Sequence, residues 1–381
     1  MRIIVFTGRG GSGVSTLASA TAAALANEGK PTLAFGLGSG LGDALLTPLT
    51  HEPAEIANAL YALETGHGQD EPDEFRDFLE ELLDWRGIDV ELAEDLAALP
   101  GSSQIGHMLN LATHVQGGEY EAVVVDGLPL EQFLDLLPSL DAAASWLDRL
   151  FAPRQQNVFE PFVRMFAADY AEAGEDLLES GRELLGRLAE LRDSLTDPDV
   201  SSVRVILRPE TTAASDAKEA LTVLNLFSYA SDALVVNRLL PDGVTDAFFE
   251  DMRSEQKNAV VEAALAATDM PVLQATLTAK TPHGVEDLVR LSETLYEDRM
   301  PGDILYRLPR HSFSEESSAY VMSLALPFAD KKDLAVEQMD DGVAVHLNGR
   351  RCVLALPSEI RNREATSWSF EPPTLKVVFK Q

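Results

Sequence analysis

The residues best suited to chemistry lie within the first sixteen positions. An apolar run from Ile3 to Phe6 leads into the segment GRGGSGVST at positions 8–16, and an Ala- and Leu-rich helical pattern follows. Glycines between a strand and a helix are typical of a phosphate loop of the form G-x-x-x-x-G-K-[ST], with Gly8 and Gly13 as its framing glycines. Ser15 then occupies the position of the magnesium-binding hydroxyl, and Val14 replaces the lysine.

The two halves of such a loop have different functions. Backbone N–H groups at a helix N-terminus can bind phosphate without any side chain, whereas the lysine offsets charge that develops during phosphoryl transfer. Losing one charge-assisted hydrogen bond costs about 1.5–3 kcal/mol of binding, while losing a cation that acts on the transition state costs about 10³–10⁵ in rate. The loop therefore predicts binding without fast hydrolysis. The alternative is a closely packed glycine turn that binds nothing.

Composition narrows the class of protein. The 381 residues carry a formal charge of −32, which disfavours nucleic acid and anionic membrane surfaces as partners. The sequence contains no run of about 18 apolar residues, which a membrane-spanning helix would need, and its N-terminus has the pattern of a strand. We therefore expect a cytoplasmic protein. The single cysteine, Cys352, excludes an internal disulfide and a Cys-x-x-Cys zinc site within one chain, and we expect its side chain to be buried.

The order of apolar runs predicts an α/β fold with a mostly parallel sheet of the P-loop NTPase type. We expect a domain at 1–310 that is interrupted by helical inserts at about 52–99 and 138–195. After residue 319 the apolar period changes to two, which predicts a small antiparallel β-sandwich over 319–381. The strands expected in the first domain are Arg2–Thr7, Pro31–Phe35, Glu121–Asp126, Val203–Leu207, Ala233–Val236 and Pro271–Gln274.

Several segments in order along the chain resemble the ArsA family, the dimeric ATPases of arsenite pumps and of tail-anchored membrane protein targeting. Besides the loop, these segments are Leu99–Gln104, Tyr120–Pro129, Arg208-Pro209-Glu210 with Glu219-Ala220, and Val236-Asn237-Arg238. The C-terminal segments Ser323–Phe328 and Leu354–Pro357 resemble the α-crystallin-like domain of one branch of the family, found largely in photosynthetic organisms and related bacteria.

The resemblance implies a homodimer that binds ATP or ADP with Mg²⁺. It implies that Asn237 contacts adenine and that Ser15 and Asp126 hold the metal. It also implies that Arg9 occupies the position of the family's signature lysine, which reaches the partner's phosphates. An acidic residue at the end of a strand often serves only to cap that strand, so Asp126 has a second, purely structural interpretation. The residues expected to bind the nucleotide are Arg9, Gly10, Gly11, Ser12, Gly13, Val14, Ser15, Thr16 and Asn237.

Departures from the family pattern bear on function. The switch aspartate that positions the attacking water is Gly36, and the cysteines for zinc and for arsenite are absent. We therefore expect no zinc and no arsenite pumping. The second insert is rich in large apolar residues, among them Phe159, Phe162, Met165 and Phe166, which form either the core of the insert or a site for an apolar helical client or a dimer partner.

Three functions remain open at this point. The first is a homodimeric nucleotide-binding chaperone or targeting-like factor with weak or lost ATPase activity, because of Val14 and Gly36. The second is a genuine but slow ATPase that uses Arg9 in place of lysine. The third is a chaperone or scaffold that has kept the fold and does not bind nucleotide.

Overall fold

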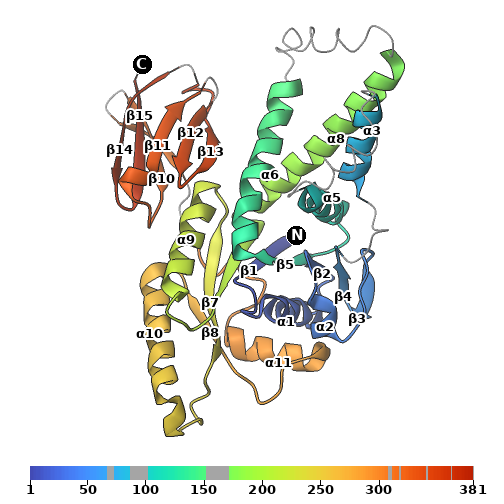
Figure 1. The fold of residues 1–381 in the computed structure, drawn as a ribbon, viewed down its shortest axis with the longest axis vertical. Coiled ribbons are helices and arrows are strands. Elements are labelled where there is room, and N and C mark those ends of the chain that lie inside the picture. The colour runs from blue at the N-terminus through green and yellow to red at the C-terminus, as the bar shows by residue number, and fades with distance from the viewer. Residues whose placement is uncertain are drawn as a thin grey trace.

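The computed structural model describes residues 1–66, 73–85, 102–151, 171–307, 311–316, 319–339, 342–361 and 363–380. Within them lies an eight-stranded sheet in the order β3-β4-β2-β5-β1-β6-β7-β8 (Figure 1). All neighbouring pairs are parallel except β3 and β4. The strands are β1 (Arg2–Gly8), β2 (Thr32–Gly36), β3 (Ala54–Ala57), β4 (Leu60–Glu64), β5 (Ala122–Pro129), β6 (Ser201–Leu207), β7 (Ser231–Leu239) and β8 (Val272–Thr276).

Helices cover both faces of this sheet, which explains why its central strands are continuously apolar. In β1, Ile4 and Phe6 pack against one layer, and Ile3 and Val5 pack against the other. The first layer contains α1 (Val14–Asn27), α2 (Leu41–Leu45) and α11 (Gly284–Tyr296). The second contains α5 (Ser102–Gly117), α6 (Leu130–Phe151), α8 (Ala171–Thr196), α9 (Ala213–Leu226) and α10 (Glu250–Ala267), with α3 (Glu74–Trp85) beside α5 and α8. The parallel sheet and its helical layers confirm the predicted fold class.

One part of the sequence prediction is wrong. The first insert was expected to be helical from residue 52, but residues 54–64 contain β3 and β4, and helix begins only at Glu74 in α3. Leu60, Ala62 and Leu63 are buried because β4 lies between β2, with which it pairs in parallel, and the edge strand β3. This pairing is a long-range contact, so the local acidic composition did not reveal it.

The C-terminal region forms two antiparallel sheets, as expected from its alternating pattern. One has the order β14-β15-β10-β9 and the other β11-β12-β13. Asn348 and Gly349, at φ 49° and 80°, form the hairpin turn between β12 and β13, and Cys352 is buried. The strands are β9 (Ser312–Glu316), β10 (Ala319–Ala325), β11 (Leu334–Gln338), β12 (Gly342–Leu347), β13 (Arg350–Ala355), β14 (Glu364–Glu371) and β15 (Thr374–Lys380), with a short 3₁₀ turn at Lys331–Asp333. Since β9 pairs with β10, the sheet begins before residue 319.

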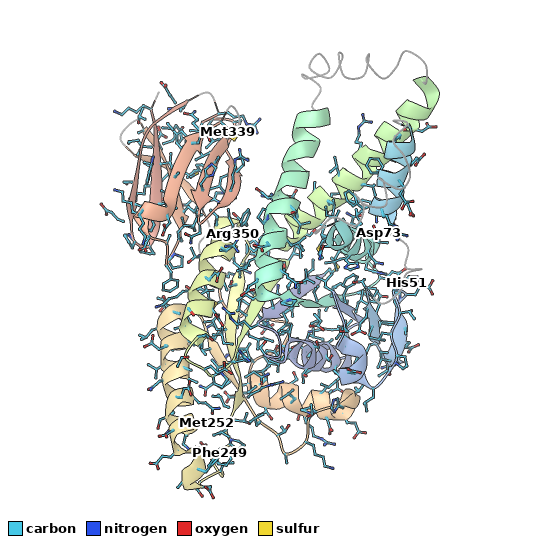
Figure 2. All side chains as sticks on the ribbon, viewed as in Figure 1. His51, Asp73, Phe249, Met252, Met339 and Arg350 are labelled. Carbon is cyan, nitrogen blue, oxygen red and sulfur yellow. The ribbon has the colours of Figure 1, made fainter. Side chains whose placement is uncertain are left out.

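The C-terminal sheets pack against α6 and α9 through polar contacts. Arg350 donates to Asp135 at 2.9 Å and lies 3.7 Å from Glu219, and Figure 2 shows it where the β domain meets these helices. Asp141, buried on α6, accepts from Arg192 at 2.9 Å and from the backbone N–H of Val353 at 3.4 Å. The β domain is therefore attached to the helices that begin beside the glycine loop.

Candidate functional site

The glycine loop leaves β1 at a point where only glycine fits. A Cβ on Gly8 would lie 2.5 Å from the carbonyl oxygen of Ile206 on the neighbouring strand. The loop then closes a turn, in which the N–H of Ser12 donates to the carbonyl of Arg9 at 2.9 Å. Gly13 has a φ of 96°, which favours glycine, and it directly precedes the first residue of α1. The loop backbone is thus compact and enters the helix as a phosphate loop does.

Asn237 fixes the loop from the end of β7. Its Nδ2 donates to the carbonyl of Ser12 at 2.8 Å, and its Oδ1 accepts from the N–H of Arg238 at 2.8 Å. A Cβ on Gly13 would lie 2.3 Å from the same Nδ2, so the glycine and the asparagine are matched. The contact of Asn237 with adenine stays a prediction. One amide hydrogen and one lone pair of its side chain are not used by these two hydrogen bonds and could serve such a contact.

The N–H groups at the start of α1 lack acceptors. Among the described residues, none accepts from the N–H of Gly13, Val14, Ser15 or Thr16, and the first α-helical bond runs from Leu17 to Gly13 at 3.1 Å. Helix N-termini with open N–H groups favour anions through both hydrogen bonding and the helix dipole. The loop therefore fits a phosphate chain, and the closed glycine turn that binds nothing is disfavoured.

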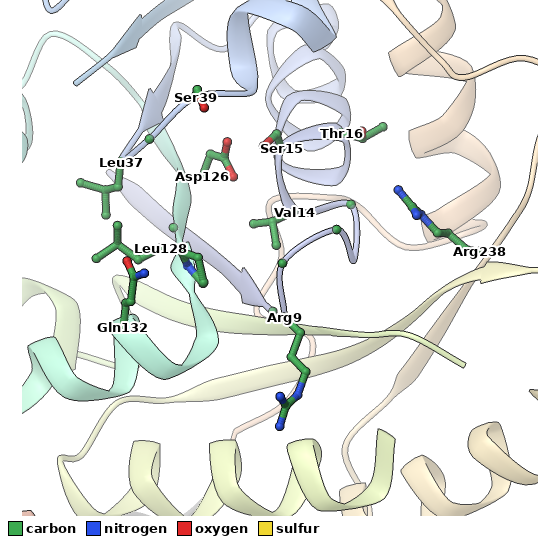
Figure 3. A pocket seen from close by; sticks show the side chains of 17 residues that line it. Arg9, Val14, Ser15, Thr16, Leu37, Ser39, Asp126, Leu128, Gln132 and Arg238 are labelled. Atoms are coloured by element: carbon green, nitrogen blue, oxygen red, sulfur yellow. The ribbon is translucent and has the colours of Figure 1, made fainter. Parts of the chain in front are cut away.

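Asp126 and Ser15 form the acidic end of the site (Figure 3). Asp126 is 5% exposed on β5, where Phe6 and Gly36 are its neighbours on adjacent strands. The pKa of Asp126 is raised to about 7. Burial is the main cause and the charge of Glu64 adds to it, while a hydrogen bond from Ser15 acts in the opposite direction. A hydroxyl and a carboxylate that are hydrogen-bonded to each other, together with phosphate oxygens and water, are suitable ligands for Mg²⁺.

Glu64 closes the segment that connects β2 to α2. Its Oε1 accepts from the N–H groups of Gly40, Leu41 and Gly42 at 2.7, 2.5 and 3.1 Å. A Cβ on Gly40 would lie 2.4 Å from the hydroxyl oxygen of Ser15, so the backbone of this segment packs directly against Ser15. Sequence reasoning missed Glu64 because it lies at the end of a strand that was expected to be helix.

Gly36 has no room for the aspartate of the family pattern. A Cβ there would lie 2.8 Å from Cγ of Glu64 and 3.0 Å from Cδ1 of Leu41. The side chain of Glu64 thus occupies the space into which a residue at position 36 would project. The water-positioning aspartate that the family resemblance implies for this position would therefore collide with Glu64.

Arg9 is held within its own chain. Its Nε donates to Asp216 on α9 at 2.7 Å, and a guanidinium NH donates to Glu131 on α6 at 3.2 Å. The hydrogen bond and charge of Asp216 raise the pKa of Arg9 above its usual value. Figure 3 shows the Arg9 side chain directed away from Ser15 and Asp126. Its expected contact with a partner's phosphates stays a prediction, and Asp216 is a partner that the sequence did not reveal.

These residues surround a cavity of about 450 Å³, a size typical of small-molecule sites. The structure brings together Arg9, Gly10, Gly11, Gly13, Val14, Ser15, Thr16 and Asp126 around it, while Ser12 and Asn237 lie behind the loop. Lining residues that were not expected are Leu37, Gly38, Ser39, Gly127, Leu128, Pro129, Gln132 and Arg238. Arg238 is the last residue of the segment Val236-Asn237-Arg238, and its place in that segment was the available signal.

Comparison with known proteins agrees with this architecture. Residues 1–297 match the family model described as anion-transporting ATPase, ArsA. The chain belongs to the ArsA family. Residues 317–379 match the HSP20-like domain found in ArsA. The predicted α-crystallin-like resemblance of the C-terminal region is thereby confirmed at the level of the domain.

Relatives extend along nearly the whole length of this ArsA-family chain. A Prosthecochloris vibrioformis protein named "Putative arsenical pump-driving ATPase" is 26% identical over 389 residues, which cover 100% of this chain and 96% of the relative. An Aquifex aeolicus protein, "Putative arsenical pump-driving ATPase 1", is 25% identical over 383 residues, with 96% of both chains covered. Protein Rv2184c of Mycobacterium tuberculosis is 27% identical over 401 residues, with 94% and 91% covered.

The described residues contain neither a clustered metal site nor a membrane-spanning helix. In those ranges, no cluster of three or more His, Cys, Asp or Glu side chains has the spacing of a metal site. Likewise, none of the helices placed there combines the length and apolarity that crossing a membrane requires. A magnesium site built from Ser15, Asp126 and phosphate oxygens would not contain such a cluster.

Proposed function

We propose that this ArsA-family protein binds ATP and ADP with Mg²⁺ at the glycine loop and hydrolyses ATP weakly or not at all. The observation that carries the proposal is the row of unpartnered N–H groups from Gly13 to Thr16 facing a 450 Å³ cavity, beside Ser15 and Asp126. Backbone amides keep their affinity for phosphate when the lysine is replaced by Val14. When bound, Mg²⁺ supplies charge neutralisation of the phosphates, and Ser15 and Asp126 hold it.

Weak hydrolysis follows from two absences in the sequence. Val14 cannot offset charge on the transferred phosphoryl group, and Gly36 cannot orient water. The slow ATPase in which Arg9 replaces lysine is the alternative, and it requires Arg9 to leave Asp216 and Glu131. The relatives' names refer to arsenical pumping, but the single cysteine of each chain cannot form a site of paired thiolates for a soft metalloid within that chain, and it is buried.

We further propose that the protein acts as a homodimeric, cytoplasmic chaperone or targeting-like factor whose nucleotide state controls client binding. The family membership and the HSP20-like domain support this function. The proposed client residues Phe159, Phe162, Met165 and Phe166 lie outside the described residues. A test compares binding of an apolar helical peptide by the wild type and by the double variant Phe162→Asp, Phe166→Asp, with the melting temperature as the control for folding.

Calorimetry with Mg-ATP and Mg-ADP tests the nucleotide site. Gly13→Ala should abolish binding, because its Cβ would meet Asn237 at 2.3 Å and its φ is 96°. Gly117→Ala is the matched control, since nothing lies within 4 Å of an added Cβ there. Absence of nucleotide binding by the wild type would leave the nucleotide-independent chaperone or scaffold as the remaining function. Phosphate release, followed on the same samples, separates binding from turnover, and sedimentation with and without Mg-ATP tests the dimer.

A further inference from the structure

We propose that Arg238 supplies, within the same chain, the positive charge that Val14 lacks, by binding the phosphate chain of the nucleotide at the end of the pocket remote from Asp126. The inference rests on the proposed nucleotide site and names one more residue of it. Arg238 lies at the end of β7, directly after the Asn237 that fixes the loop.

The pocket has two basic residues among those that line it, and only one of them is engaged. Arg9 is bound to Asp216 and Glu131. Over the described ranges, the guanidinium of Arg238 has neither an ion pair nor a hydrogen bond, and the residue is exposed. In Figure 3, Arg238 extends toward the turn that carries Thr16, while Asp126 lies on the other side of Ser15. An arginine in this place meets an anion without breaking an existing contact.

The backbone of Arg238, which lines the pocket, is held in an unusual conformation by its neighbours. Its φ is 64°, a left-handed conformation that is unfavourable for a residue with a long side chain. Asn237 accepts from the N–H of Arg238 at 2.8 Å, and the buried Gln256 donates to its carbonyl at 3.5 Å and accepts from Leu240 at 2.8 Å. Strain that neighbouring contacts enforce at a binding site is commonly part of its function.

The chemistry favours a phosphate over the base as the ligand of Arg238. A guanidinium offers a planar pair of donors that matches two phosphate oxygens. The adjacent N–H groups of Ser15 and Thr16 are open to the same anion, so the charge and the amides act together. With Asp126 and Ser15 on the metal side, the phosphate chain lies between a cation site and Arg238.

Three variants test the inference by titration with Mg-ATP, Mg-ADP and inorganic tripolyphosphate. Arg238→Gly removes the guanidinium and tolerates φ 64°, Arg238→Lys keeps a charge, and Arg299→Ala is the control, an exposed arginine outside the pocket lining. Arg238→Gly should weaken all three ligands by about 10- to 100-fold and reduce the salt dependence of binding. Arg238→Lys should recover part of the affinity, and Arg299→Ala should match the wild type.

The outcomes separate this inference from the nucleotide site itself. If the wild type binds ATP and Arg238→Gly binds it equally well, with equal salt dependence, the role of Arg238 is wrong and the nucleotide site stands. If Arg238→Gly loses affinity for ATP and ADP but not for tripolyphosphate, the guanidinium contacts the nucleoside, and the phosphate assignment is overturned. If the wild type binds none of the ligands, both proposals fail. Unchanged circular dichroism and melting temperature would show that each variant is folded.

Discussion

Nε of Arg9 lies 2.7 Å from a carboxylate oxygen of Asp216, which joins the glycine loop to the first turn of α9. Asp216 is 5% exposed, and its other oxygen, Oδ1, has no hydrogen-bond partner among the described residues. A buried carboxylate depends on its cation more than an exposed one does. Arg9 is therefore a structural partner of α9 in the single chain, whatever it contacts in a dimer.

Replacing Arg9 should cost folding stability. Arg9→Ala leaves Asp216 without its cation, so we expect the free energy of unfolding to fall by about 1–2 kcal/mol, reduced from the buried limit because Arg9 is partly exposed. Urea denaturation measures this. Arg208→Ala is the control, since Arg208 is about as exposed as Arg9 but pairs with Glu210, whose side chain is 48% exposed, whereas that of Asp216 is 6% exposed, and it should lose less than about 1 kcal/mol. Equal losses in the two variants would contradict the special role of Asp216.

Restoring the lysine should improve binding without restoring turnover. In Val14→Lys an ammonium group enters the pocket that Val14 lines, and we expect ATP affinity to rise by about 10- to 150-fold. Turnover should stay low because Gly36 still offers no carboxylate. Calorimetry and phosphate release measure the two effects separately. Val14→Met controls for side-chain size, and a rise in affinity for that variant as well would show that charge is not the cause.

Restoring the switch aspartate should fail because its space is occupied. Gly36→Asp places a Cβ 2.8 Å from Cγ of Glu64, and overpacking of this kind costs about 1–3 kcal/mol. Gly38→Asp is the matched control, with nothing within 4 Å of an added Cβ. Thermal unfolding and phosphate release should show a destabilised, inactive Gly36→Asp protein and a stable Gly38→Asp protein. Faster ATP turnover in Gly36→Asp would overturn this description of the site.

The buried Asp126 should make stability depend on pH. Its pKa is raised from 3.8 to about 7, so the folded protein binds more protons than the unfolded chain between these values. The free energy of unfolding therefore falls as pH rises through this window, by about 2 kcal/mol from pH 5.5 to 8. Asp126→Asn should remove this component. Urea denaturation of both proteins at the two pH values tests the sign, and parallel pH dependences would disprove the contribution of Asp126.

Asp141 should hold the C-terminal β domain against the helices. Asp141→Ala leaves Arg192 and the N–H of Val353 without this acceptor, so we expect a loss of about 1–3 kcal/mol and faster proteolysis between the two parts of the chain. Arg351→Ala is the control. Arg351 lies on β13, as Val353 does, but it is exposed and its side chain contacts Met339. Unchanged proteolysis of Asp141→Ala would show that the domain is held by its other contacts, among them those of Arg350 with Asp135 and Glu219.

The sequence by itself determined the fold class, the strands of the sheet other than β3 and β4, and the glycine loop that follows β1. Continuous apolar runs such as Ile3–Phe6 predict strands covered on both faces, and the glycine spacing predicts a loop that binds anions through its backbone, because both depend on local residue order. The burial of Cys352 followed from its local pattern as well.

Only the tertiary structure decided which charged side chains serve that loop. Asp216 lies 207 positions from Arg9, and Glu64 lies 22 to 24 positions from the N–H groups it binds, so no local pattern could pair them. Arg238 became a candidate because it lines the pocket and its backbone is left-handed, and neither feature can be read from the local sequence. Long-range contacts depend on how strands and helices assemble, and in this protein the assembly directs the Arg9 side chain away from Ser15 and Asp126 and places Arg238 in the lining of the pocket.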